Sequence, residues 1–389
     1  MDKQKSWKKQ EKILRRPHEI FGAPFAKAGI TEESLAYNAS NSFVAVLKKL
    51  RVTLLVSREY ENLLITLSVP KNKLEQTFFH IPHPSGIAVD HKTHSVYVAS
   101  TRNPNQIVEF KPQKEHVERT DERGVVDGRN ILMPARAKYY GGMYYFHDLA
   151  LIAGKLYANA VGMNGVVEVD MNSGTSDKLV WWPKSTEAKG GKPDTRANYI
   201  QLNSIAAGKS LSDSYFSASG AHIRSTKPRD ATYPVDGEGV IFSGKTRTPI
   251  AHGLTRPHSL RYYKKRLFVD NSGYGEVGYI QEGKFHPVAT LPGWTRGLCI
   301  IDDILFVGTS RILPRFRQYA PGVDHKKARS GIHAIDLKNM SSIGTIEFPH
   351  GNQIFAIEHI AQAVTEGFLY KTVKETTEKE QGAFFSYQV

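Results

Sequence analysis

His147-Asp148-Leu149-Ala150-Leu151 is one of six short segments that share a pattern: a polar or small opening residue, then an aliphatic residue at the third position. The other five segments open at Ser85, Asn203, His258, Arg296 and Phe355, the last of which is the apolar exception. The shortest interval between successive openings is 38 residues, from His258 to Arg296. This length is close to the ~40 residues of one four-stranded propeller blade, and repetition at this period is typical of propellers.

Two further strands are predicted behind most of these segments. Short apolar runs follow after turns that contain Gly, Asn or Asp, which is typical of antiparallel β-structure. The second strands are predicted at 95–100, 155–160, 214–219, 266–271 and 304–309, and the third at 107–110, 165–170, 239–243, 278–281 and 331–337. The longer stretches 111–145, 182–199 and 311–330 are predicted to be loops, the last of which is strongly basic.

The two ends of the repeat are incomplete. The segment that opens at Phe355 is followed by no second strand, whereas three apolar strands are left over near the N-terminus, at 42–47, 51–57 and 63–69. Joining these remainders completes a sixth blade and removes exposed sheet edges. We therefore predict an all-β fold, a six-bladed β-propeller closed by N- and C-terminal strands in one blade. A β-sandwich is the alternative, but it does not explain the repeated three-strand unit.

The propeller is predicted to span residues 38–360. Residues 1–37 form a basic N-terminal extension and residues 361–389 a charged C-terminal tail. The net charge is +14, which suits anionic partners. No apolar run is long enough for a transmembrane helix, no signal-peptide core follows the basic start, and the single Cys299 forms no internal disulfide. These features favour a cytoplasmic protein.

The order of several motifs resembles that of a bacterial family of unknown function whose members are predicted to be six-bladed propellers. The motifs are His147-Asp148-Leu149, Pro257-His258-Ser259-Leu260-Arg261, Asp270-Asn271-Ser272-Gly273-Tyr274-Gly275 and Pro292-Gly293-Trp294-Thr295-Arg296-Gly297-Leu298. The resemblance covers about 42–360 and implies a fold and a site, but no activity. The fourth segment reads Gln201-Leu202-Asn203-Ser204 where the family has His-Leu-Asn-Gly. The architecture is also distantly similar to lactonase and strictosidine synthase-like propellers.

A polar site is predicted at the mouth of the central channel, because the first strand of each blade lines that channel. The candidate catalytic residues are His147, Asp148 and His258, since imidazoles exchange protons near neutral pH and a carboxylate can orient them. The candidate substrate-binding residues, from strand openings and adjacent turns, are Asn203, Asn271, Arg296, Ser310, Arg311, Tyr145 and Arg102. Arginine provides a planar fork that binds carboxylate or phosphate.

A divalent metal is a further expectation. His147, His258 and His222 offer imidazoles for zinc or another transition ion. The lactonase-type alternative, calcium held by carboxylates and asparagines, fits less well because few carboxylates occur near the strand openings. The sequence contains no nucleophile or nucleotide-binding motif.

Two classes of function remain open. The first is an enzyme, such as a metal-assisted hydrolase, lyase or tailoring enzyme, that acts on a small anionic molecule or on a modified peptide or sugar. The second is a non-catalytic propeller that binds a ligand or a partner, which a mouth filled by Phe355 and Tyr145 would favour. Nucleic acid is not favoured, because the basic residues are spread over loops without a binding module. Each residue also has a purely structural interpretation, as a polar group that links neighbouring blades.

Overall fold

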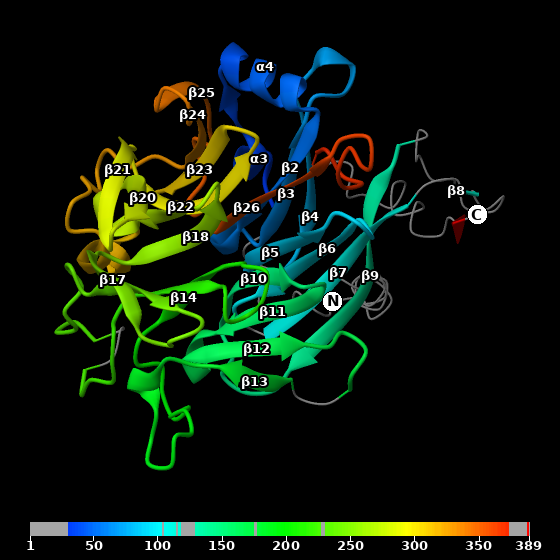
Figure 1. Cartoon of the computed structure of the whole chain (residues 1–389). Helices are drawn as coiled ribbons and strands as arrows, with labels where there is room; N and C mark the ends of the chain where they lie inside the picture. The colour runs from blue at the N-terminus through cyan, green and yellow to red at the C-terminus, as the bar shows by residue number, and fades with distance from the viewer. Residues whose placement is uncertain are drawn as a thin grey trace, which may run out of the picture.

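Six antiparallel sheets surround a central channel in the computed structural model (Figure 1). The structure describes residues 30–102, 105–113, 116–117, 129–174, 177–226, 230–372 and 387–388. Each inner strand contacts the inner strands of both neighbouring blades, in the ring order β26, β5, β10, β14, β18, β22 and back to β26. The prediction of a six-bladed β-propeller is confirmed.

Five blades are built from consecutive strands. From the innermost strand outwards, the first two consist of β5 (Pro84–Asp90), β6 (Ser95–Ser100), β7 (Asn105–Gln113) and β9 (Ile131–Tyr140), and of β10 (Phe146–Ile152), β11 (Lys155–Ala160), β12 (Gly165–Val169) and β13 (Lys178–Trp181). The next two consist of β14 (Leu202–Ala206), β15 (Tyr215–Ala218), β16 (Gly239–Ser243) and β17 (Pro249–Leu254), and of β18 (Pro257–Tyr263), β19 (Arg266–Asn271), β20 (Glu276–Gln281) and β21 (Lys284–Thr290). The fifth consists of β22 (Trp294–Ile301), β23 (Ile304–Ser310), β24 (Gly331–Asp336) and β25 (Ser341–Glu347), and β1 (Asn38–Ala39) pairs with the outer edge of β25. A separate pair joins β8 (His116–Val117) to β27 (Tyr387–Gln388).

The sixth blade closes the ring. Its inner strand is the C-terminal β26 (Ala356–Ala361), followed by β2 (Val52–Arg58), β3 (Leu63–Ser68) and β4 (Glu75–His80). β26 and β2 pair over six residues, with Val56 opposite Ile357. Both side chains are fully buried. The predicted closure of one blade by strands from both ends is therefore correct.

One of the three predicted N-terminal strands is wrong. Residues 42–47 lie in the helix α4 (Asn41–Leu50), and β4 is instead the third N-terminal strand and the outermost strand of the blade. The side-chain oxygen of Ser40 caps this helix by accepting a hydrogen bond from the amide of Phe43. Phe43 and Leu47, one helical turn apart, are buried, and the Phe43 ring lies 6.1 Å from that of Phe306 in the neighbouring blade. The apolar spacing is therefore helical, although the run is rich in valine and phenylalanine.

A second correction concerns the stretch 111–145. It contains the strand β9, which pairs with β7 across nine register positions. The other α-helix among the described residues is the short α3 (Glu32–Leu35). No helix among the described residues is long and apolar enough to cross a membrane.

The second position of the repeated segments links neighbouring blades. The carboxylate of Asp148 accepts a hydrogen bond from the amide of Ile205 at 2.9 Å. The hydroxyls of Ser204 and Ser259 accept equivalent bonds from the next inner strand, at 2.8 Å each. At Gly86 a Cβ atom would lie 2.5 Å from the Asp148 Cα, so no side chain fits there. The polar or small residue at this position is thus explained by blade-to-blade contact.

The chain continues to pack on the ring beyond residue 361, where the tail was predicted to start. Phe368 is fully buried, and its ring lies 5.5 Å from that of Phe110. The amide of Phe78 donates to the carbonyl of Tyr370 at 2.9 Å. Residues 1–29 of the predicted basic extension, and most of the tail beyond 372, lie outside the described residues.

Candidate functional site

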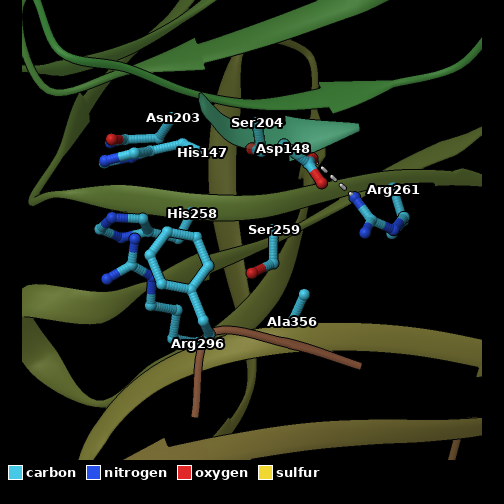
Figure 2. Close-up of a pocket in the computed structure, with 10 residues that line it drawn as sticks. His147, Asp148, Asn203, Ser204, His258, Ser259, Arg261, Arg296 and Ala356 are labelled. Atoms are coloured by element: carbon cyan, nitrogen blue, oxygen red, sulfur yellow. Dashed lines mark hydrogen bonds and ion pairs between the residues drawn. The ribbon is translucent and has the colours of Figure 1, made fainter. Parts of the chain in front are cut away.

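The openings of the inner strands meet in a small pocket in the channel (Figure 2). It is lined by His147, Asp148, Asn203, Ser204, His258, Ser259, Arg261, Arg296, Phe355 and Ala356. Its free volume is about 10 Å³, which is room for a single water molecule. We call its four polar side chains from first positions, His147, Asn203, His258 and Arg296, the mouth site.

His258 presents an unprotonated ring nitrogen to this pocket. Its Nδ1 lies 2.8 Å from the backbone carbonyl oxygen of Arg256, a group that only accepts, so Nδ1 carries the proton. Nε2 is therefore a lone-pair acceptor, and it is buried without a hydrogen-bond partner among the described residues. Burial, together with Arg296 and Arg256, holds the pKa of His258 well below its ordinary value. The ring is thus a neutral base at physiological pH.

His147 lies beside it, two blades away around the ring. Figure 2 shows its ring next to the Asn203 carboxamide and above the ring of His258. No hydrogen bond of its buried Nδ1 is found within the described part of the chain. Burial, and then Arg296, lowers the pKa of His147 far below its usual range. The structure thus brings both predicted histidines into one pocket.

Arg296 is a buried cation without a counter-ion among the described residues. It is 5% exposed, and its guanidinium carbon lies 3.4 Å from the centre of the Phe355 ring. Its Nε and Nη2 have no hydrogen-bond partner among the residues that the structure describes. Burial lowers its pKa to about 10, while the more distant Glu59 acts in the opposite direction.

Arg256, which the sequence analysis did not single out, adds a second buried cation. Its Nη1 donates to the side-chain oxygen of Gln201 at 2.9 Å, and its guanidinium lies 4.2 Å from the centre of the Tyr319 ring. Burial lowers its pKa to about 10 as well. Within the described residues, neither Arg256 nor Arg296 has a carboxylate within ion-pair distance. The mouth site therefore carries an unbalanced positive charge.

Asp148 belongs to a different cluster. Besides the Ile205 amide, its carboxylate accepts from Arg261 at 3.1 Å, and Arg261 also donates to Glu358 at 3.2 Å. Burial raises the pKa of Asp148, opposed by Arg261. In Figure 2 the Asp148 carboxylate points away from the two imidazoles and toward Arg261. Its contacts connect blades rather than orient His147 or His258.

The other predicted residues do not line the pocket. Asn271 accepts from the Thr255 amide and donates to Glu276, Ser310 bonds to the backbone of residue 354, and Arg102 pairs with Glu59 at 2.8 Å. Arg311 donates to the carbonyl of Pro349, Tyr145 is half-buried beside the mouth, and His222 is exposed. Most of the polar side chains predicted from turns therefore form hydrogen bonds or ion pairs with neighbouring segments of the propeller instead of facing the pocket.

Arg261 and Glu358 were also missed, although the sequence carries a signal for them. The fourth position of the repeated segments is alanine in three blades, at 88, 150 and 206. In the other three it is Arg261, Cys299 and Glu358. A charged residue or a cysteine at a position where the repeat otherwise has alanine indicates that this side chain does more than fill space between strands.

Aromatic side chains from two loops pack near the mouth site. The 3-10 helix η6 (Pro314–Tyr319) brings Phe316 to 5.7 Å from the Trp294 ring, which in turn lies 5.8 Å from the His258 ring. Tyr233, from the loop before β16, is buried in the same apolar cluster. These loop residues therefore pack beside His258 through Trp294, whereas the residues that line the pocket come from the inner strands and Phe355.

Comparison with known proteins supports this architecture. Residues 41–368 match the family described as "Domain of unknown function (DUF4915)". The chain belongs to this family. The predicted resemblance to a propeller family of unknown function is therefore confirmed. No curated protein matches the chain.

The solved structures similar to this DUF4915 protein that we compare have low sequence identity to it. A nidogen/laminin complex matches at a TM-score of 0.50 with 12% identity, covering 79% of this chain and 98% of the other. A gluconolactonase from Xanthomonas campestris matches at 0.43 with 13% identity, covering 69% and 77%. Regucalcin, a calcium-binding protein from Agrobacterium tumefaciens, matches at 0.42 with 11% identity, covering 67% and 73%. At these identities the first likeness shows the fold alone.

Proposed function

We propose that this DUF4915 protein is an enzyme that binds a small anionic group at the mouth site and acts on the molecule that carries it. One observation carries the proposal: among the described residues, two nitrogens of the buried Arg296 guanidinium and the Nε2 of His258 have no hydrogen-bond partner, and they share one pocket. An uncompensated buried charge is costly, and a bound anion removes that cost.

The residues divide into two roles. Arg296, supported by the field of Arg256, binds a carboxylate, phosphate or sulfate through charge-assisted hydrogen bonds. His258 accepts a proton at Nε2, because its Nδ1–H is already donated to the Arg256 carbonyl. Binding an anion adds negative charge beside both imidazoles, which raises their depressed pKa toward the range of a general base. Anion binding would therefore make the His258 imidazole a stronger base.

The size of the pocket limits the substrate. The pocket has room for a single water molecule, so its lining side chains must move apart to admit one oxyanion group. The rest of the molecule would then lie outside the pocket, near aromatic residues such as Trp294 and Phe316. A small organic acid or phosphate ester, or a peptide or sugar that carries such a group, suits this arrangement.

Calorimetric titration with inorganic phosphate, sulfate and acetate tests the binding step. The wild-type protein should bind at least one of them with one site, and Arg296→Gln should weaken binding by about 1.5–3 kcal/mol, the usual worth of a hydrogen bond to a charged group. Arg102→Gln is the matched control, because its guanidinium is paired with Glu59 outside the pocket. Equal affinities of the wild type and Arg296→Gln would refute the proposal.

His258→Gln separates binding from catalysis. Glutamine keeps a polar group near the anion but accepts no proton, so the variant should retain phosphate binding and lose turnover of any substrate found by screening anionic compounds. Unchanged turnover would remove His258 from the reaction.

The alternative is a non-catalytic ligand-binding propeller. The small volume of the pocket and the burial of Phe355 against Arg296 favour it. On this interpretation the anion is a permanent structural ligand. It would then copurify with the protein in stoichiometric amount and resist dialysis, whereas a substrate site would exchange its anion.

The metal expected at His147, His258 and His222 stays a prediction. Within the described residues no third His, Cys, Asp or Glu ligand atom gathers with the two imidazoles at metal-ligand spacing. His222 is exposed and does not line the pocket. The cytoplasmic location and the bacterial origin of the chain likewise remain predictions.

A further inference from the structure

A thiol, a carboxylate and an imidazole gather at a second place in the ring. Cys299 lies on β22, and Glu358 and His359 lie on β26, the adjacent inner strand that closes the propeller. The Cys299 Sγ, a carboxylate oxygen of Glu358 and a ring nitrogen of His359 are all within 4.8 Å of one another. We call these three residues the thiol cluster; none of them belongs to the mouth site.

We propose that the thiol cluster is a structural site for Zn²⁺ or a similar thiophilic divalent ion, which clamps the closing strand β26 to β22. Sulfur and imidazole nitrogen, completed by a carboxylate oxygen, are the ligands that zinc prefers. The Cys299 Sγ lies 3.4 Å from the His359 Nδ1. Zinc bonds of about 2.3 Å to sulfur and 2.1 Å to nitrogen in a tetrahedron place these two atoms about 3.6 Å apart.

A second imidazole stands beside His359. The ring of His91, on the turn after β5, is centred 5.0 Å from the ring of His359. This turn belongs to the blade on the other side of β26. An ion held by Cys299, Glu358 and His359 would therefore connect the two blades that meet where the ring closes, next to His91 of the third.

The charges of the neighbouring groups also fit a dication. Arg261 contacts two carboxylates, Asp148 and Glu358, so one negative charge is in excess. A divalent ion with one thiolate and the Glu358 carboxylate forms a neutral centre and leaves Arg261 paired with Asp148 alone. Binding releases the thiol proton of Cys299 to solvent. Cys299 is buried, whereas Glu358 and His359 are partly exposed, which gives the ion a path from solvent.

Cobalt titration tests the site, because Cys299 is the single cysteine of the chain. Full-length protein without a histidine tag is dialysed against chelator and titrated with Co²⁺, then with Zn²⁺. One equivalent of Co²⁺ should produce a near-ultraviolet thiolate-to-cobalt charge-transfer band, which Zn²⁺ should abolish by displacement. Such a band can arise only from Cys299.

Four variants complete the test. Cys299→Ser should remove the band, and His359→Gln should weaken cobalt binding by at least about 100-fold, because even outer-sphere partners of a metal are worth about 10–100-fold in affinity. His359→Gln also covers the case in which Cys299→Ser does not fold. His222→Gln and His258→Gln are the controls and should bind Co²⁺ as the wild type does.

The proposal is overturned if Co²⁺ binds without a charge-transfer band, if the band survives unchanged in His359→Gln, or if His258→Gln rather than His359→Gln loses the ion. Absence of stoichiometric binding of both Co²⁺ and Zn²⁺ to folded wild-type protein overturns it as well. Each of these results leaves anion binding at the mouth site untouched, so the two proposals fail separately.

Discussion

Replacing Arg296 by methionine should stabilise the anion-free protein, which is an unusual outcome for a buried side chain. Methionine keeps most of the volume and the contact with Phe355 but removes the charge. Burial lowers the pKa of Arg296 to about 10, well below the ordinary value of a guanidinium. At 1.36 kcal/mol per pKa unit, this shift corresponds to about 3 kcal/mol of unfavourable free energy for the buried charge at neutral pH.

The cation–π contact with Phe355 opposes this gain. At 3.4 Å in a desolvated site it contributes up to about 2 kcal/mol. The net expectation for Arg296→Met is therefore a free energy of unfolding about 1–2 kcal/mol higher than that of the wild type. Urea denaturation at pH 7, in dilute zwitterionic buffer without phosphate or sulfate, measures this difference.

Arg102→Met is the matched control. Its partner Glu59 is buried and would be left without its closest cation, so this variant should lose about 1–3 kcal/mol. The reasoning is refuted if Arg296→Met destabilises the anion-free protein by more than about 1 kcal/mol, because the guanidinium would then be a satisfied structural group.

Three further predictions follow from the same contacts. Deletion of residues 350–389 should abolish cooperative unfolding in calorimetry, because it opens the ring and removes the buried Ile357, Ile360 and Phe368. Burial of each of these side chains contributes about 1.5–3 kcal/mol, and their sum is a large part of the ~5–15 kcal/mol that stabilises a protein. A truncated chain that melts like the parent would contradict the closure of the ring. Asp148→Ala should lower the free energy of unfolding in urea by about 1–3 kcal/mol, because it leaves the buried Ile205 amide without its acceptor. The folded variant should bind phosphate as the wild type does. Loss of phosphate binding at unchanged stability would instead place Asp148 in the site. Burial lowers the pKa of His333 to about 4 from 6.5, so the unfolded chain binds a proton at this histidine before the folded protein does. The free energy of unfolding should therefore fall by about 3 kcal/mol as the pH drops from 6.5 toward 4. His333→Gln should flatten this dependence of stability on pH, and an unchanged dependence would contradict the shift.

The inner strands of the propeller could be predicted because their pattern is local. An opening polar residue, an aliphatic third position and a turn to the next strand repeat along the chain whatever lies opposite. The helix α4 could not be separated from a strand by apolar content alone, since a short run such as Phe43 to Leu47 suits both. Ser40 ahead of that run is the capping signal that would have favoured the helix.

The mouth site could be predicted only as far as the inner strands position it. His147, Asn203, His258 and Arg296 share one strand position and therefore meet in one pocket. Asn271 and Ser310 stand in turns, where their partners come from segments far away in the sequence, and such partners leave no local trace. The positive charge of Arg256 enters the site for the same reason: it lies in the turn before β18.

The central claim is that an anion binds between Arg296 and His258, and a crystal structure of the protein grown with selenate tests it most directly. The anomalous signal of selenium locates the anion independently of the protein density. The proposed site predicts a peak within hydrogen-bond distance of the Arg296 Nη2, beside the His258 ring, and no such peak in Arg296→Met. An empty mouth site in the wild type, with Arg296 bonded only to protein or water, would contradict the account.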